Sequence, residues 1–385
     1  MAHADTSLLG ELYIAREHGG PLIVTRPLRS LPLIAIRLSI PYQELPGLEN
    51  AGRVLQLISE ERARSEIRRF GGRLELSQTP THLVYSLSGP SANLGELASV
   101  LRYLVSAPVI RPGTEDVVWH LAQNEALGGV ERADLAVRRQ LLARLFPTSR
   151  LRTGPKGSGQ VPDREGLEWS WRRWFRPESS SIVVVGDIGP HLSRAAFSGW
   201  TPPPPPGPSP GKGMVPGGTE PETEIMAPRV GIGYDGVGVE PAVLLTISEL
   251  LSDALLSLGL AETRSEFWWL DRRRALVMLG ASPLDTRLTP VEMRIALQLG
   301  LADLSTGISA REVRRARNRI RQRLLLRART PTGLASLIGE FLERTGDPYG
   351  LEEFMKALDR TGLDEVRSGL RTLIYTSPEI VELVP

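Results

Sequence analysis

Apolar and polar positions along this chain fall into short strand-like runs that are followed by helical patterns. The segment GRLELSQTPTHLVYSLSG at 72–89 holds two such runs on either side of Thr79-Pro80, which predicts a β-hairpin. Leucines then recur at intervals of three or four over 93–105, and this spacing predicts a helix with one apolar face. A capping threonine, Thr114, predicts a second helix that runs to about Glu125.

The same order of elements occurs again in the second half of the chain. LAETRSEFWWLDRRRALVMLGAS, which begins at Leu260, is another pair of strand-like runs, and capping residues at Thr289 and Ser309 then begin two helices. Each half also has an earlier strand and helix and a closing strand: 31–40, 49–59 and 181–186 in the first, and 229–238, 241–256 and 380–384 in the second. The repetition predicts an α+β fold of two similar domains, each an antiparallel-rich β-sheet with helices packed on one face. Internal duplication is the simplest explanation, and chance similarity of two common element orders is the alternative.

The largest change in composition along the chain is at 201–228. This segment, TPPPPPGPSPGKGMVPGGTEPETEIMAP, is dominated by proline and glycine, so it is not expected to bury apolar surface or complete backbone ladders. We interpret it as an interdomain linker. It divides the chain into an N-terminal domain at 1–200 and a C-terminal domain at 229–385, both within the usual size range of a domain.

Composition excludes several classes of site. The chain has no cysteine, which rules out disulfides, thiolate zinc sites, iron–sulfur clusters and cysteine nucleophiles. Its formal net charge of +2 gives no overall attraction to nucleic acid. The first residues lack the pattern of a secretory signal, and no segment has the roughly 18 apolar residues of a membrane span. We therefore expect a soluble, cytoplasmic protein without a membrane span, or a periplasmic one if its start has been processed.

With these elements in order, the chain resembles the pitrilysin or insulinase type of zinc metallopeptidase, the group that includes the mitochondrial processing peptidase. The residues that carry the resemblance extend over nearly the whole chain. They are PGLENAG at 46–52, the hairpin that follows Phe70, SSSIVVVGDIG at 179–189, and TGDPYGLEEFMKALDRTGLDEVRSGL at 345–370. The resemblance implies two similar domains and, in active members, an inverted zinc motif His-x-x-Glu-His on the first helix.

The resemblance also implies that this chain has lost its zinc site. The family phrase Ala-Gly-x-x-His-x-x-Glu-His, aligned from Ala51, places Leu55, Ile58 and Ser59 where the ligands and the general base belong. Leucine and isoleucine carry no donor atom. The third family ligand falls near Glu125, which we interpret as a solvated helix carboxylate. We therefore expect no catalytic residue, no metal ligand and no cofactor.

A second family feature is missing as well. Zinc-free subunits of two-subunit members commonly grip the substrate backbone with an arginine and a tyrosine, seven residues apart, near the C-terminal hairpin. The matching positions here are Leu255 and Glu262, and Arg264 is a substitute only after a local shift in register.

Three other groups of residues each have two interpretations. His82, His120 and Glu125 are a conceivable zinc site, although ordinary surface or half-buried histidines are the favoured reading. The arginine-rich run at 311–329 reads as a solvated helix face with a narrow apolar stripe, with nucleic-acid or anionic-lipid contact as the alternative. The tryptophans of EWSWRRWF at 168–175 are expected in the core rather than at an interface.

The function that the resemblance implies is that of a pseudoenzyme. The chain is expected to be the non-catalytic subunit of a zinc metallopeptidase heterodimer, in which it shapes a peptide-binding chamber for unfolded peptides beside a related zinc-bearing partner. A structural or assembly role in a larger complex, like that of the core proteins of respiratory complexes, is the alternative. An arginine-mediated nucleic-acid binder is a third hypothesis.

Overall fold

The structure is a computed structural model of the 385-residue chain. It describes residues 9–43, 48, 51–108, 131–146, 163–200, 202–207, 227–256, 258–260, 262–270, 273–283 and 288–384. The chain forms two compact units, and each is assembled from three stretches of sequence. Unit 1 consists of Met1–Ala126, Arg152–Glu220 and Leu325–Glu352, and unit 2 consists of Leu127–Leu151, Pro221–Leu324 and Glu353–Pro385. Each unit therefore takes one segment from the opposite half of the chain.

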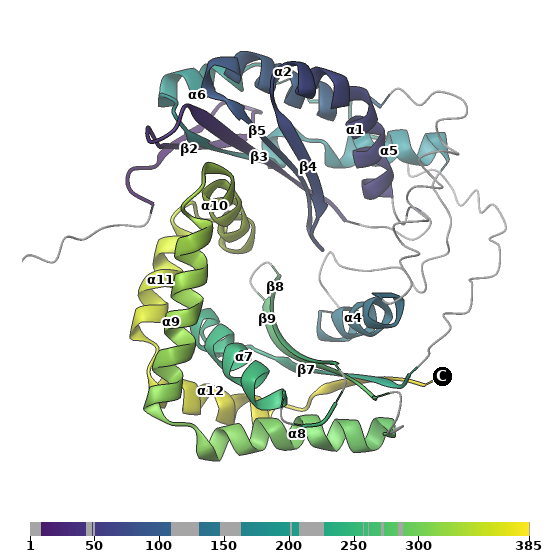
Figure 1. Cartoon of the computed structure of the whole chain (residues 1–385). Coiled ribbons are helices and arrows are strands. Elements are labelled where there is room, and N and C mark those ends of the chain that lie inside the picture. Colours follow the sequence, from purple (N-terminus) through teal and green to yellow (C-terminus); the bar gives the residue numbers. More distant parts are fainter. Residues whose placement is uncertain are drawn as a thin grey trace, which may run out of the picture. The chain divides into compact units, whose positions relative to one another are not determined.

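Unit 1 is built on a six-stranded sheet (Figure 1). Its strands are β1 (Tyr13–Arg16), β2 (Leu22–Pro27), β3 (Leu33–Pro41), β4 (Arg73–Gln78), β5 (His82–Pro90) and β6 (Ser181–Gly186), in the spatial order β1-β2-β6-β3-β5-β4. Among the described strands of this sheet, only β2 and β6 pair in parallel. The predicted hairpin is confirmed as β4 and β5, and the predicted closing strand as β6. The sequence prediction missed β1 and β2.

Helices cover both faces of the first sheet. Four lie on one face: α1 (Ala51–Arg69), α2 (Leu94–Val105), α5 (Arg164–Trp174) and α6 (Pro190–Ala196). Figure 1 shows α10 (Pro331–Thr345), from the C-terminal half of the sequence, on the opposite face, where it contacts β3 and β6. The predicted helices thus pack on one face, and α10, from a distant part of the sequence, packs on the other. The predicted helix that runs to Glu125 lies outside the described residues.

Unit 2 repeats the central part of this topology. Its four strands are β7 (Arg229–Asp235), β8 (Glu262–Leu270), β9 (Arg273–Ala281) and β10 (Glu379–Leu383), in the spatial order β10-β7-β9-β8 with antiparallel pairs throughout. This order corresponds strand for strand to β6-β3-β5-β4 in unit 1. Two similar α+β units are therefore present, as the repeated element order predicts.

The helices of unit 2 also cover both faces of their sheet. One face carries α7 (Pro241–Leu255), α8 (Pro290–Gly307) and α12 (Leu363–Tyr375), and the other carries α4 (Glu131–Leu145) (Figure 1). The glycines of β7 allow α4 to approach closely, because a Cβ atom on Gly231 would lie 2.4 Å from a methyl carbon of Val137. Two further described helices, α9 (Ala310–Arg327) and α11 (Gly350–Arg360), begin or end in unit 1 and lie mostly in unit 2. Capping boxes at Thr289 and Ser309 begin α8 and α9, as predicted.

Candidate functional site

The positions that align with the family zinc motif are on α1, which packs against the hairpin of the first sheet. Gly52 allows this packing, since a Cβ atom there would lie 2.8 Å from a methyl carbon of Leu83. Leu55 and Ile58 are 1% and 2% exposed and belong to the core cluster between α1 and the sheet. Neither side chain can donate an electron pair to a metal. The two positions now contribute apolar packing instead.

Ser59, the third position of the motif, takes part in the contact between two helices. Its Oγ lies 2.8 Å from the carbonyl oxygen of Leu55 and 2.8 Å from that of Leu104 on α2. The residue is only 6% exposed. Tyr85 of β5 is buried in the same core, and this burial raises the pKa of its hydroxyl. The surroundings of Ser59 therefore favour neutral groups rather than a charged metal complex.

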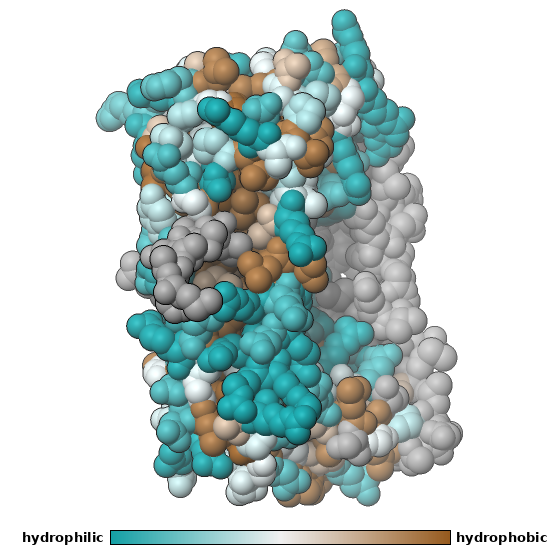
Figure 2. All heavy atoms as spheres, turned by 60° about the vertical axis from the view of Figure 1, so that its left-hand side comes forward, coloured by the Kyte–Doolittle hydropathy of each residue, from teal (hydrophilic) through white to brown (hydrophobic). Residues whose placement is uncertain are grey.

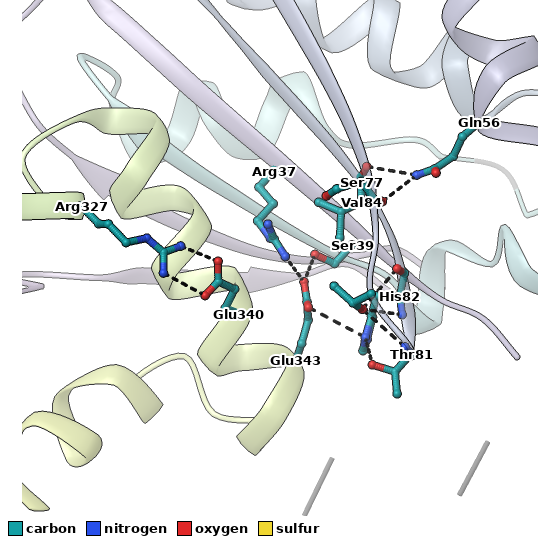
Figure 3. A network of polar contacts seen from close by, with 11 residues as sticks. Arg37, Ser39, Gln56, Ser77, Thr81, His82, Val84, Arg327, Glu340 and Glu343 are labelled. Atoms are coloured by element: carbon teal, nitrogen blue, oxygen red, sulfur yellow. Dashed lines mark hydrogen bonds and ion pairs between the residues drawn. The ribbon is translucent and has the colours of Figure 1, made fainter. Parts of the chain in front are cut away.

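Gln56 is a buried polar residue at this position that the sequence analysis did not identify. Its Nε2 donates to the carbonyl oxygens of Ser77 on β4 and Val84 on β5, at 2.9 and 3.2 Å (Figure 3). These two carbonyls belong to partner residues in the β4–β5 register. The amide thus joins α1 to the hairpin. The sequence does contain a signal for this role, because Gln56 is a polar residue between the apolar residues Leu55 and Ile58.

The described residues offer no alternative metal site. They contain no group of three or more histidine, aspartate or glutamate residues with a suitable arrangement. Of the histidine site considered from the sequence, His120 and Glu125 lie outside the described residues. His82 is described, and its Nδ1 lies 2.8 Å from the Thr81 hydroxyl and 4.0 Å from Glu343.

His82 borders a buried ion pair on the α10 face of the first sheet. Glu343 of α10 accepts hydrogen bonds from Nη2 of Arg37 at 2.6 Å and from the hydroxyl of Ser39 at 2.5 Å (Figure 3). The Arg37 and Glu343 side chains are 6% and 7% exposed. Gly339 lets α10 lie directly on the arginine, because a Cβ atom there would come within 2.4 Å of Arg37 Cδ. This cluster fastens α10 to the sheet.

The positions of the substrate-gripping pair are occupied differently from the family pattern. Leu255 ends α7 and is fully buried in the core of unit 2. Glu262 begins β8 and forms an ion pair with Arg229 at 3.1 Å. Arg264 is exposed on β8, two residues further along, so it lies on the same face of the strand as Glu262. Whether Arg264 contacts a peptide stays a prediction.

The arginine-rich run forms α9, and carboxylates from neighbouring helices neutralise much of it. Arg319 pairs with Glu249 and Asp253 of α7, and Arg321 pairs with Asp359 of α11. Arg323 and Arg327 have carboxylate partners as well. Figure 2 shows hydrophilic side chains gathered on the side of the molecule to which α9 belongs. The apolar stripe is buried as predicted. This pairing supports the solvated-face interpretation over phosphate binding.

The tryptophans of α5 are mostly in the core, as expected. Trp169 and Trp174 are 8% and 3% exposed, and Trp171 packs partly against the same cluster. Among the helices of the described residues, none is long and apolar enough to cross a membrane.

Comparisons with known proteins relate this structure to peptidases. A scan against protein-family models finds no match, and a search of curated proteins finds none either. Among solved structures, a protease from Helicobacter pylori matches with a TM-score of 0.77 and 12% identity, over 97% of this chain and 100% of that one. A peptidase M16 inactive domain from Pseudomonas fluorescens matches with a TM-score of 0.76 and 14% identity, over 97% of each chain.

A third structure has about twice the length. The periplasmic protease PqqL from Escherichia coli matches with a TM-score of 0.72 and 13% identity, over 98% of this chain and 46% of that one. These matches confirm the resemblance inferred from the sequence. The chain has the two-domain α+β fold of the M16-like, pitrilysin-type peptidases, a fold that active and inactive proteins share.

Proposed function

We propose that this chain is the non-catalytic subunit of a two-subunit zinc metallopeptidase. The observation that supports the proposal is that the three positions aligned with the family zinc motif are buried residues within an M16-like fold. Leu55 and Ile58 are packed in the core, and Ser59 bonds to backbone carbonyls. A similar structure is itself an inactive domain, which is compatible with this role.

Catalysis by this fold needs chemistry that Leu55, Ile58 and Ser59 lack. Hydrolysis requires two neutral imidazoles to hold the metal and a carboxylate to take a proton from its bound water. Ile58 stands at the carboxylate position and has no group that accepts a proton. In the proposed heterodimer the partner supplies zinc and the general base. This chain supplies part of the wall that surrounds an unfolded peptide.

The proposal is tested by co-expression with a zinc-bearing peptidase of the same fold, such as one encoded by an adjacent gene. Light scattering should show a one-to-one complex, and zinc analysis should find metal in the partner and none in this chain purified alone. Peptide hydrolysis should rise on pairing. The matched control is a partner whose motif glutamate is replaced by glutamine, which should form the complex and lose hydrolysis.

Three results would contradict the proposal. The first is about one zinc per chain in the isolated protein, and the second is peptide hydrolysis by the isolated protein. The third is a monomer both when the chain is purified alone and when it is co-expressed with the partner. A stable complex whose hydrolysis equals that of the partner alone would instead favour the structural or assembly role.

A further inference from the structure

The predicted linker begins with a segment whose conformation is set by its composition. Residues 202–206 are five consecutive prolines, followed by Gly207. Each proline ring fixes its own φ angle, and each also keeps the preceding residue out of the helical region. The segment must therefore be extended in the polyproline II conformation, with three residues per turn and no internal hydrogen bonds. We call residues 202–207 the proline strap.

The burial of the proline strap has the period of this conformation. Pro203 is buried and Pro206 is half-buried, whereas Pro202, Pro204 and Pro205 are exposed. Residues three apart lie on the same edge of a polyproline II helix. One edge of the strap is therefore seated on unit 1, and the other two edges face solvent.

The surface under the strap is made by the aromatic and basic residues of α5 and its C-terminal end. Trp169 Nε1 donates to the carbonyl oxygen of Gly207 at 3.0 Å, and Arg176 Nη1 donates to that of Pro203 at 3.5 Å. The guanidinium of Arg173 lies 5.2 Å from the centre of the Trp169 ring. Aromatic side chains form the grooves that recognise proline-rich peptides in the polyproline II conformation. The indole N–H of Trp169, which donates to a strap carbonyl, is a contact of this kind.

An open cavity continues this surface. It has a volume of about 360 Å³, and its walls include Trp171, Phe175, Trp200 and the strap residues Pro202–Pro204. Trp171 is held in place, because its Nε1 donates to the carbonyl oxygen of Val105 at 2.9 Å. Mostly apolar walls and a size of a few hundred cubic ångströms are typical of ligand sites.

We propose that this surface is a recognition site for proline-rich peptide segments, which the proline strap occupies in the free chain. Its ligand in a complex is a polyproline II segment of a partner protein, which replaces the strap on Trp169 and the adjoining cavity. The proposal is independent of the peptidase-subunit role, because none of these residues belongs to the zinc-motif positions.

The probe is a fluorescently labelled peptide with the sequence of residues 201–211, TPPPPPGPSPG, measured by anisotropy with the full-length chain. In the wild type the tethered strap competes at an effective concentration in the millimolar range. The double variant Pro203→Gly, Pro206→Gly removes the two seated rings, so the peptide should bind it at least about tenfold more tightly than the wild type. The control, Pro205→Gly, replaces an exposed proline of the strap that is not part of the cavity wall and should behave like the wild type.

Two tryptophan variants, each combined with the double variant, test the contact itself. Trp169→Phe keeps an aromatic ring but removes the N–H, and it should weaken peptide binding by about three- to tenfold. Trp174→Phe on the same helix is the control, because the Trp174 N–H has no acceptor among the described residues and should not affect affinity. Circular dichroism checks folding, and Pro203→Ala with Pro206→Ala replaces the glycine variant if that one does not fold.

Several outcomes would overturn the proposal. The first is that the labelled peptide shows no saturable binding to a folded strap variant. The second is that the wild type and both strap variants bind the peptide with equal affinity. The third is that Trp169→Phe leaves the affinity for the peptide unchanged. A fourth outcome comes from light scattering of the wild type, measured with and without the peptide. A dimer that the peptide dissociates would make a second copy of this chain the occupant and would overturn the assignment to a foreign partner.

Discussion

Removing Glu343 should be far more destabilising than removing the whole Arg37–Glu343 pair. The two side chains are 6% and 7% exposed, and Glu343 is the acceptor for both Arg37 and Ser39. In Glu343→Ala the guanidinium keeps its burial and loses its partner, which typically costs about 3–5 kcal/mol. Arg37 Nε already lacks an acceptor among the described residues, so little compensation is available.

The double variant Arg37→Met, Glu343→Leu removes both charges and keeps apolar volume on each side. Replacing a buried ion pair in this way is often neutral or stabilising by about 1–4 kcal/mol. The double variant should therefore be within about 1 kcal/mol of the wild type or more stable, although each single variant is destabilised by several kcal/mol. Glu343→Gln, which keeps the shape and one acceptor oxygen, should fall between the wild type and Glu343→Ala.

Urea unfolding of the wild type, Arg37→Met, Glu343→Leu and the double variant gives the double-mutant cycle. Circular dichroism follows the whole chain, and tryptophan fluorescence follows both units, because Trp169 and Trp174 belong to unit 1 and Trp268 and Trp269 to unit 2. A coupling free energy of about 2 kcal/mol or more is expected for groups in direct contact. Additive single variants that together cost less than about 1 kcal/mol would refute the reasoning, because α10 would then be held by its apolar contacts alone.

Three further predictions concern other parts of the fold. The Ser309 hydrogen bonds lower the pKa of Glu312, so this cap contributes stability above the ordinary glutamate value of 4.5 and loses it as pH falls through the lowered pKa. Ser309→Ala should raise that pKa in an NMR titration and cost about 1 kcal/mol in urea unfolding at pH 7. Gly231→Ala should cost about 1–3 kcal/mol because its Cβ would meet α4, whereas Gly95→Ala, which meets no atom within 4 Å, should be neutral or slightly stabilising. We also propose that the chain divides at 201–228, in which case limited trypsin digestion should cut first after Lys212; early cuts within either hairpin would contradict this division.

The strands and capped helices of the two repeated blocks were predictable because their signals are local. Alternation, helical spacing and caps such as Thr289-x-x-Glu292 lie within a few residues of the elements they specify. The helix on the second face of each sheet was not predictable in this way. In LPLIAIRLSI, Arg37 alternates with apolar residues and suggests a solvent-facing edge. Its partner Glu343 lies 306 residues away, so no local pattern connects the two.

The candidate site shows the same limit at shorter range. Residue types alone predict that Leu55 and Ile58 cannot bind zinc. The packing of these positions depends on tertiary contacts, such as that of Ser59 with the carbonyl of Leu104, 45 residues away. Gln56 is a polar residue in an apolar stretch, which indicates that its side chain has a buried hydrogen-bond partner. The sequence does not identify that partner, which the structure shows to be the carbonyls of Ser77 and Val84.

These contacts bear on how the zinc-motif positions can be changed. The triple variant Leu55→His, Ile58→Glu, Ser59→His restores the motif letters, yet it places a carboxylate where a side chain is 2% exposed and removes a hydroxyl that bonds between α1 and α2. A buried, unpaired carboxylate is disfavoured strongly enough that it would stay protonated or open the core. Metal could offset this cost only with a third ligand and with hydrogen-bond partners that orient the ligands, and Glu125, the family position for the third ligand, lies outside the described residues. Restoring the motif letters therefore has to overcome the packing of Leu55 and Ile58 in the core before any metal can bind.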